Sequence, residues 1–145
     1  TSTVSLLREQ TTVRALSPVY ETAPVGTTDQ PNFLNAAALV ETSLSARHFK
    51  ETVLSPIEQA LHRVRTEDKN APRTIDLDIA LFNYDVIDFD QHHIPDPDIL
   101  SYPHVALPLA DLASFYVHPE TGETLGDIAA RMSREGIQLR PDVEL

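Results

Sequence analysis

Apolar residues recur along the chain with the periods of both strands and helices. Hydrophobic and β-branched residues favour a strand over 13–20, where Pro18 indicates an edge position or a bulge. A longer apolar run predicts a central strand over 34–42. Alternating apolar and acidic residues predict a strand over 75–82, and a short strand is expected at 86–87.

Helices are predicted where a capping residue precedes an apolar stripe. Ser45 and Thr124 are expected to be caps, and Ser55, Pro56 and Glu58 form a capping box that separates two helices. The expected helices cover 4–10, 46–54, 55–62, 107–113 and 124–134. Polar or proline-rich loops are expected over 22–33, 66–74 and 92–103. Strands and helices that do not alternate regularly predict an α+β domain.

Length, composition and net charge limit the classes of protein to which the chain can belong. With 145 residues, 41% hydrophobic and 23% charged, the chain is typical of one globular domain spanning 1–145. A net charge of −11 argues against nucleic acid or an anionic membrane as a partner. Neither a membrane-spanning apolar run nor a signal peptide is visible, so a cytoplasmic protein is expected. The chain starts at Thr1 without Met, at what resembles the end of a helix, so we expect preceding residues.

The cysteine and glycine content excludes several kinds of active site. The chain has no cysteine, which excludes thiolate metal sites and cysteine nucleophiles. Its four glycines do not form a phosphate-binding loop of the G-x-G-x-x-G or G-x-x-x-x-G-K-[ST] type. Any nucleotide phosphates would therefore be bound by side chains and metal.

Asp76 and Asp78 are the strongest chemical signal. On a strand, residues two apart share a face, so the two carboxylates project together while Ile75, Leu77 and Ile79 occupy the other face. Paired carboxylates repel each other and suit Mg²⁺, which takes one or two carboxylates together with substrate phosphates. The alternative is the exposed polar face of an edge strand.

A basic stretch leads into this acidic pair. Its members are Arg63, Arg65, Lys69 and Arg73, four of the chain's eleven cations. Guanidinium groups match phosphate oxygens, and cations beside paired carboxylates are typical of phosphoryl transfer. The alternative is a solvated basic loop.

Phe33 and Asn35 could bind a flat heterocycle, by stacking and by an amide hydrogen bond, although a phenylalanine at a strand start is also an ordinary core residue. Among the histidines, His92 and His93 could form a metal site with Asp96 and Asp98, but adjacent residues on a regular element diverge. His104 and His118 are interpreted as surface or packing residues.

The segment 72–79, Pro-Arg-Thr-Ile-Asp-Leu-Asp-Ile, resembles the P-R-T-L-D-L-D signature of the 6-hydroxymethyl-7,8-dihydropterin pyrophosphokinase family. Segments 17–26, 29–37, 57–58, 63–65 and 94–109 also resemble family segments, in the right order. The resemblance implies a ferredoxin-like α+β fold, an antiparallel sheet with helices packed on it in three αβα layers, whose first strand, ending in G-S-N-L-G, is missing here. It implies transfer of diphosphate from ATP to the hydroxymethyl group of the pterin, with release of AMP, in folate biosynthesis.

The resemblance also implies roles for individual residues. Asp76 and Asp78 would hold two Mg²⁺ ions with ATP as co-substrate, and Arg63 and Arg73 would be catalytic. The expected pterin-binding residues are Thr22, Val25, Gly26, Phe33, Asn35 and His104. The expected ATP-binding residues are Glu58, Arg65, Lys69 and Ile79. The protein would be a monomer, or be fused to or associated with other folate enzymes.

Several positions depart from the family pattern. They are Asn70 for Trp, Ala71 for Gly, Asp96 for an ATP-contacting His, Tyr102 for Arg, His104 for an aromatic residue, and an inserted residue near Ser55. These departures leave open a divergent homologue acting on another pterin-like alcohol, or a non-catalytic nucleotide-binding module. A metal hydrolase using His92, His93 and Asp96 is the third hypothesis.

Overall fold

The computed structural model describes residues 3–22, 33–67 and 76–143, and of 62–67 it describes only the backbone. The chain divides into two compact units, which are described separately: Thr1–Arg14 with Val40–Ile79 and Leu145, and Ala15–Leu39 with Ala80–Glu144. In chain order the elements are α1 (Thr3–Gln10), β1 (Thr12–Leu16), β2 (Tyr20–Thr22), β3 (Phe33–Asn35), β4 (Ala38–Glu41), α2 (Ala46–Phe49), the π-helical turn η1 (Lys50–Leu54), α3 (Ser55–Glu67), β5 (Ile87–Phe89), β6 (His92–Ile94), the 3₁₀ helix η2 (Pro97–Leu100), α4 (Pro103–Ala113), α5 (Leu125–Ala130) and β7 (Ile137–Leu139).

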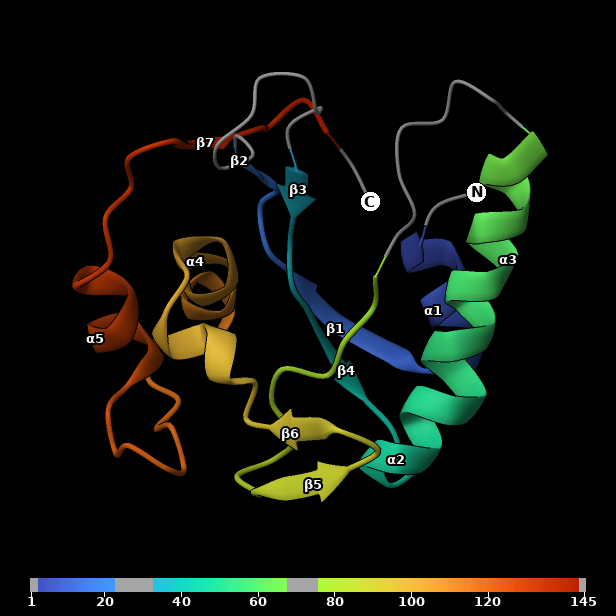
Figure 1. Cartoon of the computed structure of the whole chain (residues 1–145), viewed down its shortest axis with the longest axis horizontal. Coiled ribbons are helices and arrows are strands. Elements are labelled where there is room, and N and C mark those ends of the chain that lie inside the picture. The colour runs from blue at the N-terminus through green and yellow to red at the C-terminus, as the bar shows by residue number, and fades with distance from the viewer. Residues whose placement is uncertain (1–2, 23–32, 68–75, 144–145) are drawn as a thin grey trace. The chain divides into compact units, whose positions relative to one another are not determined.

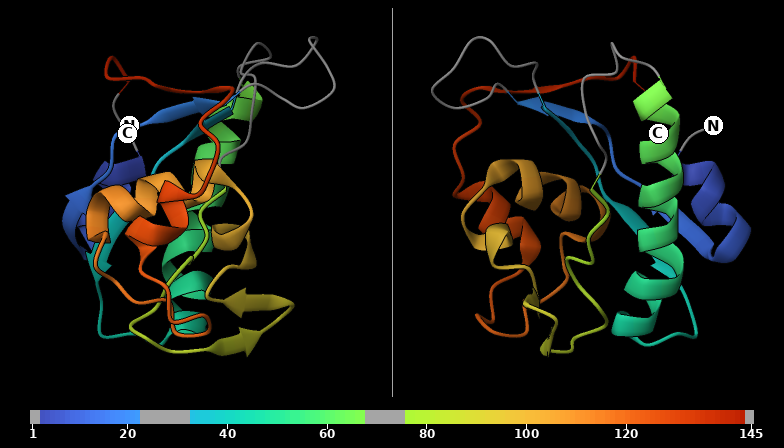
Figure 2. Two further views of the ribbon diagram at one scale, coloured as in Figure 1. Left: turned by 90° about the vertical axis from the view of Figure 1, so that its left-hand side faces the viewer. Right: turned by 45° about the vertical axis from the view of Figure 1, so that its right-hand side comes forward.

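The first unit is built around a continuous helical segment that runs from α2 through η1 into α3, with α1 beside it (Figure 1; Figure 2). Ser45 caps this segment, because its side chain accepts a hydrogen bond from the His48 N–H. The core consists of the apolar side chains of the four helical elements, namely Leu7, Phe49, Val53, Leu54 and Ile57.

The predicted helix break near Ser55 is wrong. Ser55 has helical angles, φ −63° and ψ −43°, and its N–H donates to the Lys50 carbonyl five residues back. This wider turn leads into Pro56, which has no N–H to donate, so the helical path continues through the proline. The helix also ends at Glu67 and not near His62, so two residues of the loop predicted at 66–74 are helical.

The second unit contains an antiparallel sheet with strand order β3-β2-β7 and the β5-β6 hairpin. Helix α4 packs on β2 and β3, and α5 packs on α4, as Figure 1 and Figure 2 both show. Thr124 caps α5 as predicted, by accepting from the Asp127 N–H. The core residues fall into two clusters, Ile99, Ala106, Leu125 and Ile128, and Tyr20, Leu107 and Ala129. An α+β fold with antiparallel strands and helices packed on them is confirmed.

The predicted strands over 13–20 and 34–42 are both interrupted. At the interruption the Ser17 N–H donates to the Ala37 carbonyl, and the Ala37 N–H donates to the Ser17 hydroxyl. The Ser17 hydroxyl thus takes the place of a backbone carbonyl as acceptor. Pro18, which has no N–H, cannot donate to a continued ladder. The second run was predicted to be a central strand, but its first part, β3, is an edge strand of the three-stranded sheet.

The predicted strand over 75–82 is not formed by its described residues, 76–82. The carbonyl of Leu77 accepts from the Lys50 ammonium, and the carbonyl of Ala80 accepts from the Asp96 N–H. These two carbonyls are therefore bonded to groups outside a strand ladder. The short strand expected at 86–87 is present as β5, shifted to begin at Ile87.

Other predicted boundaries are corrected within the second unit. The segment 92–103 was expected to be irregular, but it contains β6 and η2. Helix α4 begins at Pro103, four residues before its predicted start, and α5 ends at Ala130 instead of Arg134. In the part of the chain that the structure describes, no helix is both long and apolar enough to span a bilayer.

Candidate active site

Asp76 and Asp78 are exposed, while Leu77 and Ile79 pack against the apolar core of the first unit. The alternation of acidic and apolar side chains predicted from the sequence is therefore present, although the segment is not a strand. Ile79, an expected ATP-binding residue, contributes packing here. Packing of the partly buried Leu77 and Ile79 anchors the segment and leaves both carboxylates accessible to a ligand.

Lys50 is the residue of this site that sequence reasoning missed. Its Nζ lies 2.9 Å from Oε1 of Glu58 and 3.4 Å from Oδ1 of Asp78, and it donates to the carbonyl of Leu77. The Lys50 side chain is only 15% exposed, compared with 23% for Glu58 and 58% for Asp78. The ammonium group therefore ties the acidic segment to the helical segment.

The π-helical turn explains why Lys50 reaches Glu58. In a regular α-helix, residues eight apart lie two turns apart but are offset by about 80° around the axis. A π turn has one extra residue, and η1 lies between Lys50 and Glu58. The two side chains therefore meet two turns apart. The insertion near Ser55 expected from the resemblance is the sequence feature that could have indicated this turn.

Exposed carboxylates supply the oxygen ligands that suit Mg²⁺. Across the described residues, no group of three or more His, Cys, Asp or Glu side chains is placed to hold a metal ion. Two carboxylates completed by phosphate oxygens are a usual arrangement for this ion, so Asp76 and Asp78 fit it as a pair.

The basic residues predicted beside the acidic pair are only partly covered by the structure. Arg63 and Arg65 belong to the last part of α3, of which the structure describes only the backbone. Lys69 and Arg73 lie outside the described residues, as do Val25 and Gly26 of the predicted pterin pocket.

Three predicted pterin-binding residues come together on the sheet of the second unit. Thr22 lies directly opposite Phe33, and Tyr20 lies opposite Asn35. Directly opposed residues and residues two apart share a face, so all four side chains lie on one face of the β2-β3 pair. Phe33 is 45% exposed and hence is not the core residue of the alternative interpretation.

Tyr20 anchors the inner end of this face. It is buried in the core, and its hydroxyl donates to the carboxylate of Asp111 on α4. Burial and this hydrogen bond raise the pKa of Tyr20 to about 12. This face is thus buried at Tyr20 and accessible to a ligand at Phe33.

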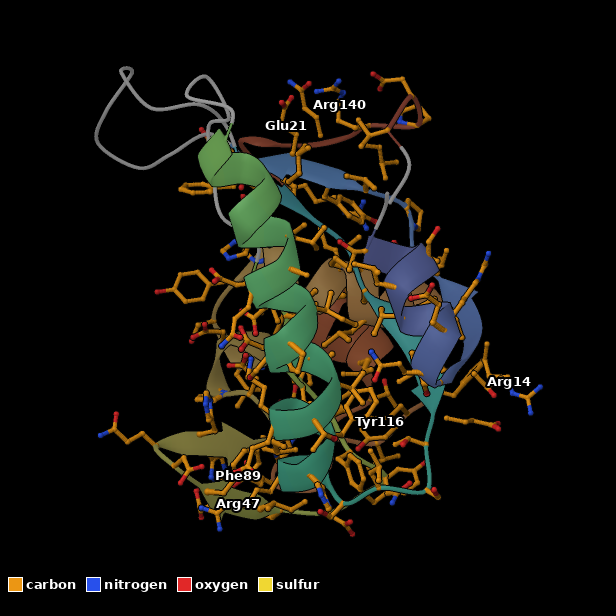
Figure 3. All side chains as sticks on the ribbon, turned by 90° about the vertical axis from the view of Figure 1, so that its right-hand side faces the viewer. Arg14, Glu21, Arg47, Phe89, Tyr116 and Arg140 are labelled. Carbon is orange, nitrogen blue, oxygen red and sulfur yellow. The ribbon has the colours of Figure 1, made fainter. Side chains whose placement is uncertain are left out.

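The opposite face of β2 carries an ion pair that fixes β7. Figure 3 labels Glu21 and Arg140, which lie side by side with Nη1 3.0 Å from Oε2. Arg140 also donates two hydrogen bonds to Asp142, at 2.9 and 2.8 Å, and these lower the pKa of the Asp142 carboxyl to about 2.

Three positions that depart from the family pattern make local contacts in the second unit, namely Asp96, Tyr102 and His104. Asp96 caps η2 by accepting from the Asp98 N–H at 2.9 Å. The rings of Tyr102 and His104 lie 5.2 Å apart with a tilt of 33°. Partial burial lowers the pKa of His104, so a neutral imidazole stands beside an exposed phenol.

The histidines do not form the metal site of the hydrolase hypothesis. His92 lies against the ring of Phe89, with centroids 5.4 Å apart. Nδ1 of His93 is 2.7 Å from Asp88 and Nε2 is 3.0 Å from Glu120, so both ring nitrogens face carboxylates. Both nitrogens are thus engaged by carboxylates, and among the described residues His93 is not placed with other ligands around a metal.

His118 is a packing residue, as predicted. It is 1% exposed, and its Nδ1 accepts hydrogen bonds from the N–H groups of Glu120 and Thr121. Burial lowers its pKa, which favours the neutral ring.

The fold and these groups define an α+β protein with an exposed carboxylate pair and a sheet face that presents an aromatic ring. The family model described as 7,8-dihydro-6-hydroxymethylpterin-pyrophosphokinase (HPPK) matches residues 1–114, and the chain belongs to this family.

Curated relatives agree with this assignment. The chain is 43% identical over 95 residues to the 2-amino-4-hydroxy-6-hydroxymethyldihydropteridine pyrophosphokinase of Helicobacter pylori, a match that covers 65% of this chain and 58% of that protein. It is 36% identical over 132 residues to the protein of the same name from Pseudomonas aeruginosa, covering 91% and 80%. It is 36% identical over 138 residues to the folic acid synthesis protein fol1 of Schizosaccharomyces pombe, covering 94% of this chain and 19% of that protein. The matches thus span between about a fifth and four fifths of these relatives.

The His93 contacts predict a pH dependence. Hydrogen bonds to Asp88 and then to Glu120 raise the pKa of His93 above its usual 6.5. The contribution of these hydrogen bonds to the stability of the folded protein is therefore complete below about pH 6.5. It is lost as the pH rises through the higher folded-state pKa of His93. An NMR titration should show His93 titrating above 6.5 and His118 below it. Asp88→Asn should lower the His93 value, whereas Glu135→Gln, which removes the same charge elsewhere, should not. Equal values for the two histidines would contradict the described contacts.

Proposed function

We propose that the protein catalyses Mg²⁺-dependent transfer of diphosphate from ATP to the hydroxymethyl oxygen of 6-hydroxymethyl-7,8-dihydropterin, in folate biosynthesis. The observation that carries this proposal is the pair of exposed carboxylates, Asp76 and Asp78, on a segment anchored by partly buried neighbours. Family membership and the names of the relatives support the choice of reaction.

In the proposed reaction the hydroxymethyl oxygen attacks the β-phosphorus of ATP. The bond between that phosphorus and the oxygen bridging to the α-phosphate breaks, AMP leaves, and the hydroxyl proton passes to solvent. Two Mg²⁺ ions, when bound, supply charge neutralisation on the phosphates. Asp76 and Asp78 would hold them.

The remaining residues bind and orient the two substrates in this proposal. Arg63 and Arg73 are assigned to the transferring phosphates, where a planar guanidinium matches the oxygens. The ATP contacts assigned from the family pattern are Glu58, Arg65, Lys69 and Ile79.

The pterin is assigned to the exposed end of the β2-β3 face. Phe33 would stack on the ring, and Asn35 would hydrogen-bond to its edge, with Thr22 directly across the ladder from Phe33. Val25, Gly26 and His104 complete the assigned set. The proposal takes residues 1–145 as one catalytic domain that acts alone or joined to other folate enzymes.

The direct test is release of AMP from ATP by the purified protein. We expect AMP that requires both Mg²⁺ and hydroxymethyldihydropterin, and Asp76→Asn should lower turnover at least about a hundredfold by removing one anionic ligand. Glu135→Gln is the matched control and should retain turnover. If saturating ATP, Mg²⁺ and pterin give no AMP with the unaltered protein, the catalytic proposal fails. The two alternatives, another pterin-like alcohol as substrate or a non-catalytic nucleotide-binding module, would then be separated by an acceptor screen and an ATP-binding measurement.

The pterin assignment is tested by two neighbouring residues of equal exposure. Phe33 and Leu34 are each 45% exposed, and adjacent strand residues point to opposite faces. Phe33→Ala should raise the KM for the pterin by about tenfold and leave the KM for ATP unchanged, because stacking is lost. Leu34→Ala should change either KM by less than about twofold. Steady-state kinetics with each substrate varied will decide, and equal effects of the two substitutions would contradict the assignment.

A further inference from the structure

We propose that Lys50 is a positioning residue that keeps Glu58 from coordinating divalent cations. As a result, Asp76 and Asp78 bind a metal ion weakly until a polyphosphate accompanies it. This role rests on the proposed function, because it concerns the metal assigned to Asp76 and Asp78. It concerns a lysine outside the motifs that identified the family.

The geometry places the Lys50 ammonium between two carboxylates. Its Nζ is 2.9 Å from Glu58 and 3.4 Å from Asp78, so one cation already bridges the helical segment and the acidic segment. A divalent ion that took Glu58 and Asp78 together would have to displace it. Because Nζ also donates to the carbonyl of Leu77 and the side chain is 15% exposed, the ammonium is held at this point by three partners.

The charges of the cluster favour the same conclusion. Glu58, Asp76 and Asp78 carry three negative charges when ionised, and Lys50 reduces the sum to −3 + 1 = −2. The nearby charges on the same helical segment, Arg47 and Glu51, pair with each other at 3.4 Å. Lys50 is therefore the cation that directly contacts this cluster in the described part of the chain.

A fixed ammonium repels an approaching divalent ion. At a separation of about 6 Å, in a medium as polar as water, a unit charge changes the affinity of a divalent ion by about tenfold. Metal that arrives with a triphosphate has much of its charge neutralised and is repelled less. The arrangement thus favours the metal–nucleotide complex over the free ion and keeps Glu58 out of the coordination of the metal.

The test is calorimetric titration of Mn²⁺ alone, without nucleotide, into the whole chain. Lys50→Met should bind Mn²⁺ about tenfold more tightly than the unaltered protein, because one positive charge is lost and Glu58 is released. Lys50→Gln is a second neutral variant that keeps N–H donors for Glu58 and Leu77, and it should show the same direction if Lys50→Met does not fold. Lys50→Arg retains the charge and should stay within about twofold of the unaltered protein.

A double variant tests whether the gain requires the Glu58 carboxylate. Adding Glu58→Gln to Lys50→Met should abolish most of the gain, since the released carboxylate would no longer be present. Unchanged or weaker Mn²⁺ binding by folded Lys50→Met and Lys50→Gln would overturn the role of Lys50. A gain that persists fully in the double variant would also overturn it, because Glu58 would then not be involved. These outcomes are independent of AMP release, so failure of the proposed reaction is recognised separately.

Discussion

The contact on which the acidic segment depends is the one between the Lys50 ammonium and its three oxygen partners. Residues 76–82 have no place in a described strand ladder, so their position within each unit comes from packing and from individual hydrogen bonds. Leu77 and Ile79 supply the packing, and Lys50 supplies the polar tie. A charged hydrogen bond that is largely shielded from water is worth more than an exposed ion pair, which is why this one lysine matters.

The sheet of the second unit holds an aromatic ring in a fixed position without burying it. Antiparallel pairing places Phe33 and Asn35 on the face that Tyr20 shares with α4. Tyr20 closes the inner end of that face through Asp111, and Phe33 at the outer end remains 45% exposed. One face therefore serves both the core and the proposed pterin site.

Sequence reasoning succeeded where one residue decides local structure. Ser45 and Thr124 are caps because their hydroxyls reach the first free N–H groups, and this depends only on neighbours in the chain. The alternating exposure around Asp76 and Asp78 also follows from local pattern. The assigned pterin and metal residues came from the family resemblance, and the structure brings Thr22, Phe33 and Asn35 together on one face of β2 and β3.

It failed where distant groups compete for backbone hydrogen bonds. The alternating residues at 75–82 suggested a strand, but Lys50 and Asp96 take carbonyls that a neighbouring strand would use. Proline at position 56 suggested a break, but the π-helical turn carried the helix past it and aligned Lys50 with Glu58. A regular α-helix would have left these two residues offset by about 80° around the axis.

The central claim is that Asp76 and Asp78 bind the metal ions while Lys50 keeps Glu58 apart from them. A crystal structure with Mg²⁺ and a non-hydrolysable ATP analogue tests it most directly. We predict carboxylate oxygens of Asp76 and Asp78 on the metal ions, phosphate oxygens completing their coordination, and the Lys50 ammonium still bonded to Glu58. Coordination of Mg²⁺ by Glu58, or metal ions that do not touch Asp78, would contradict the account.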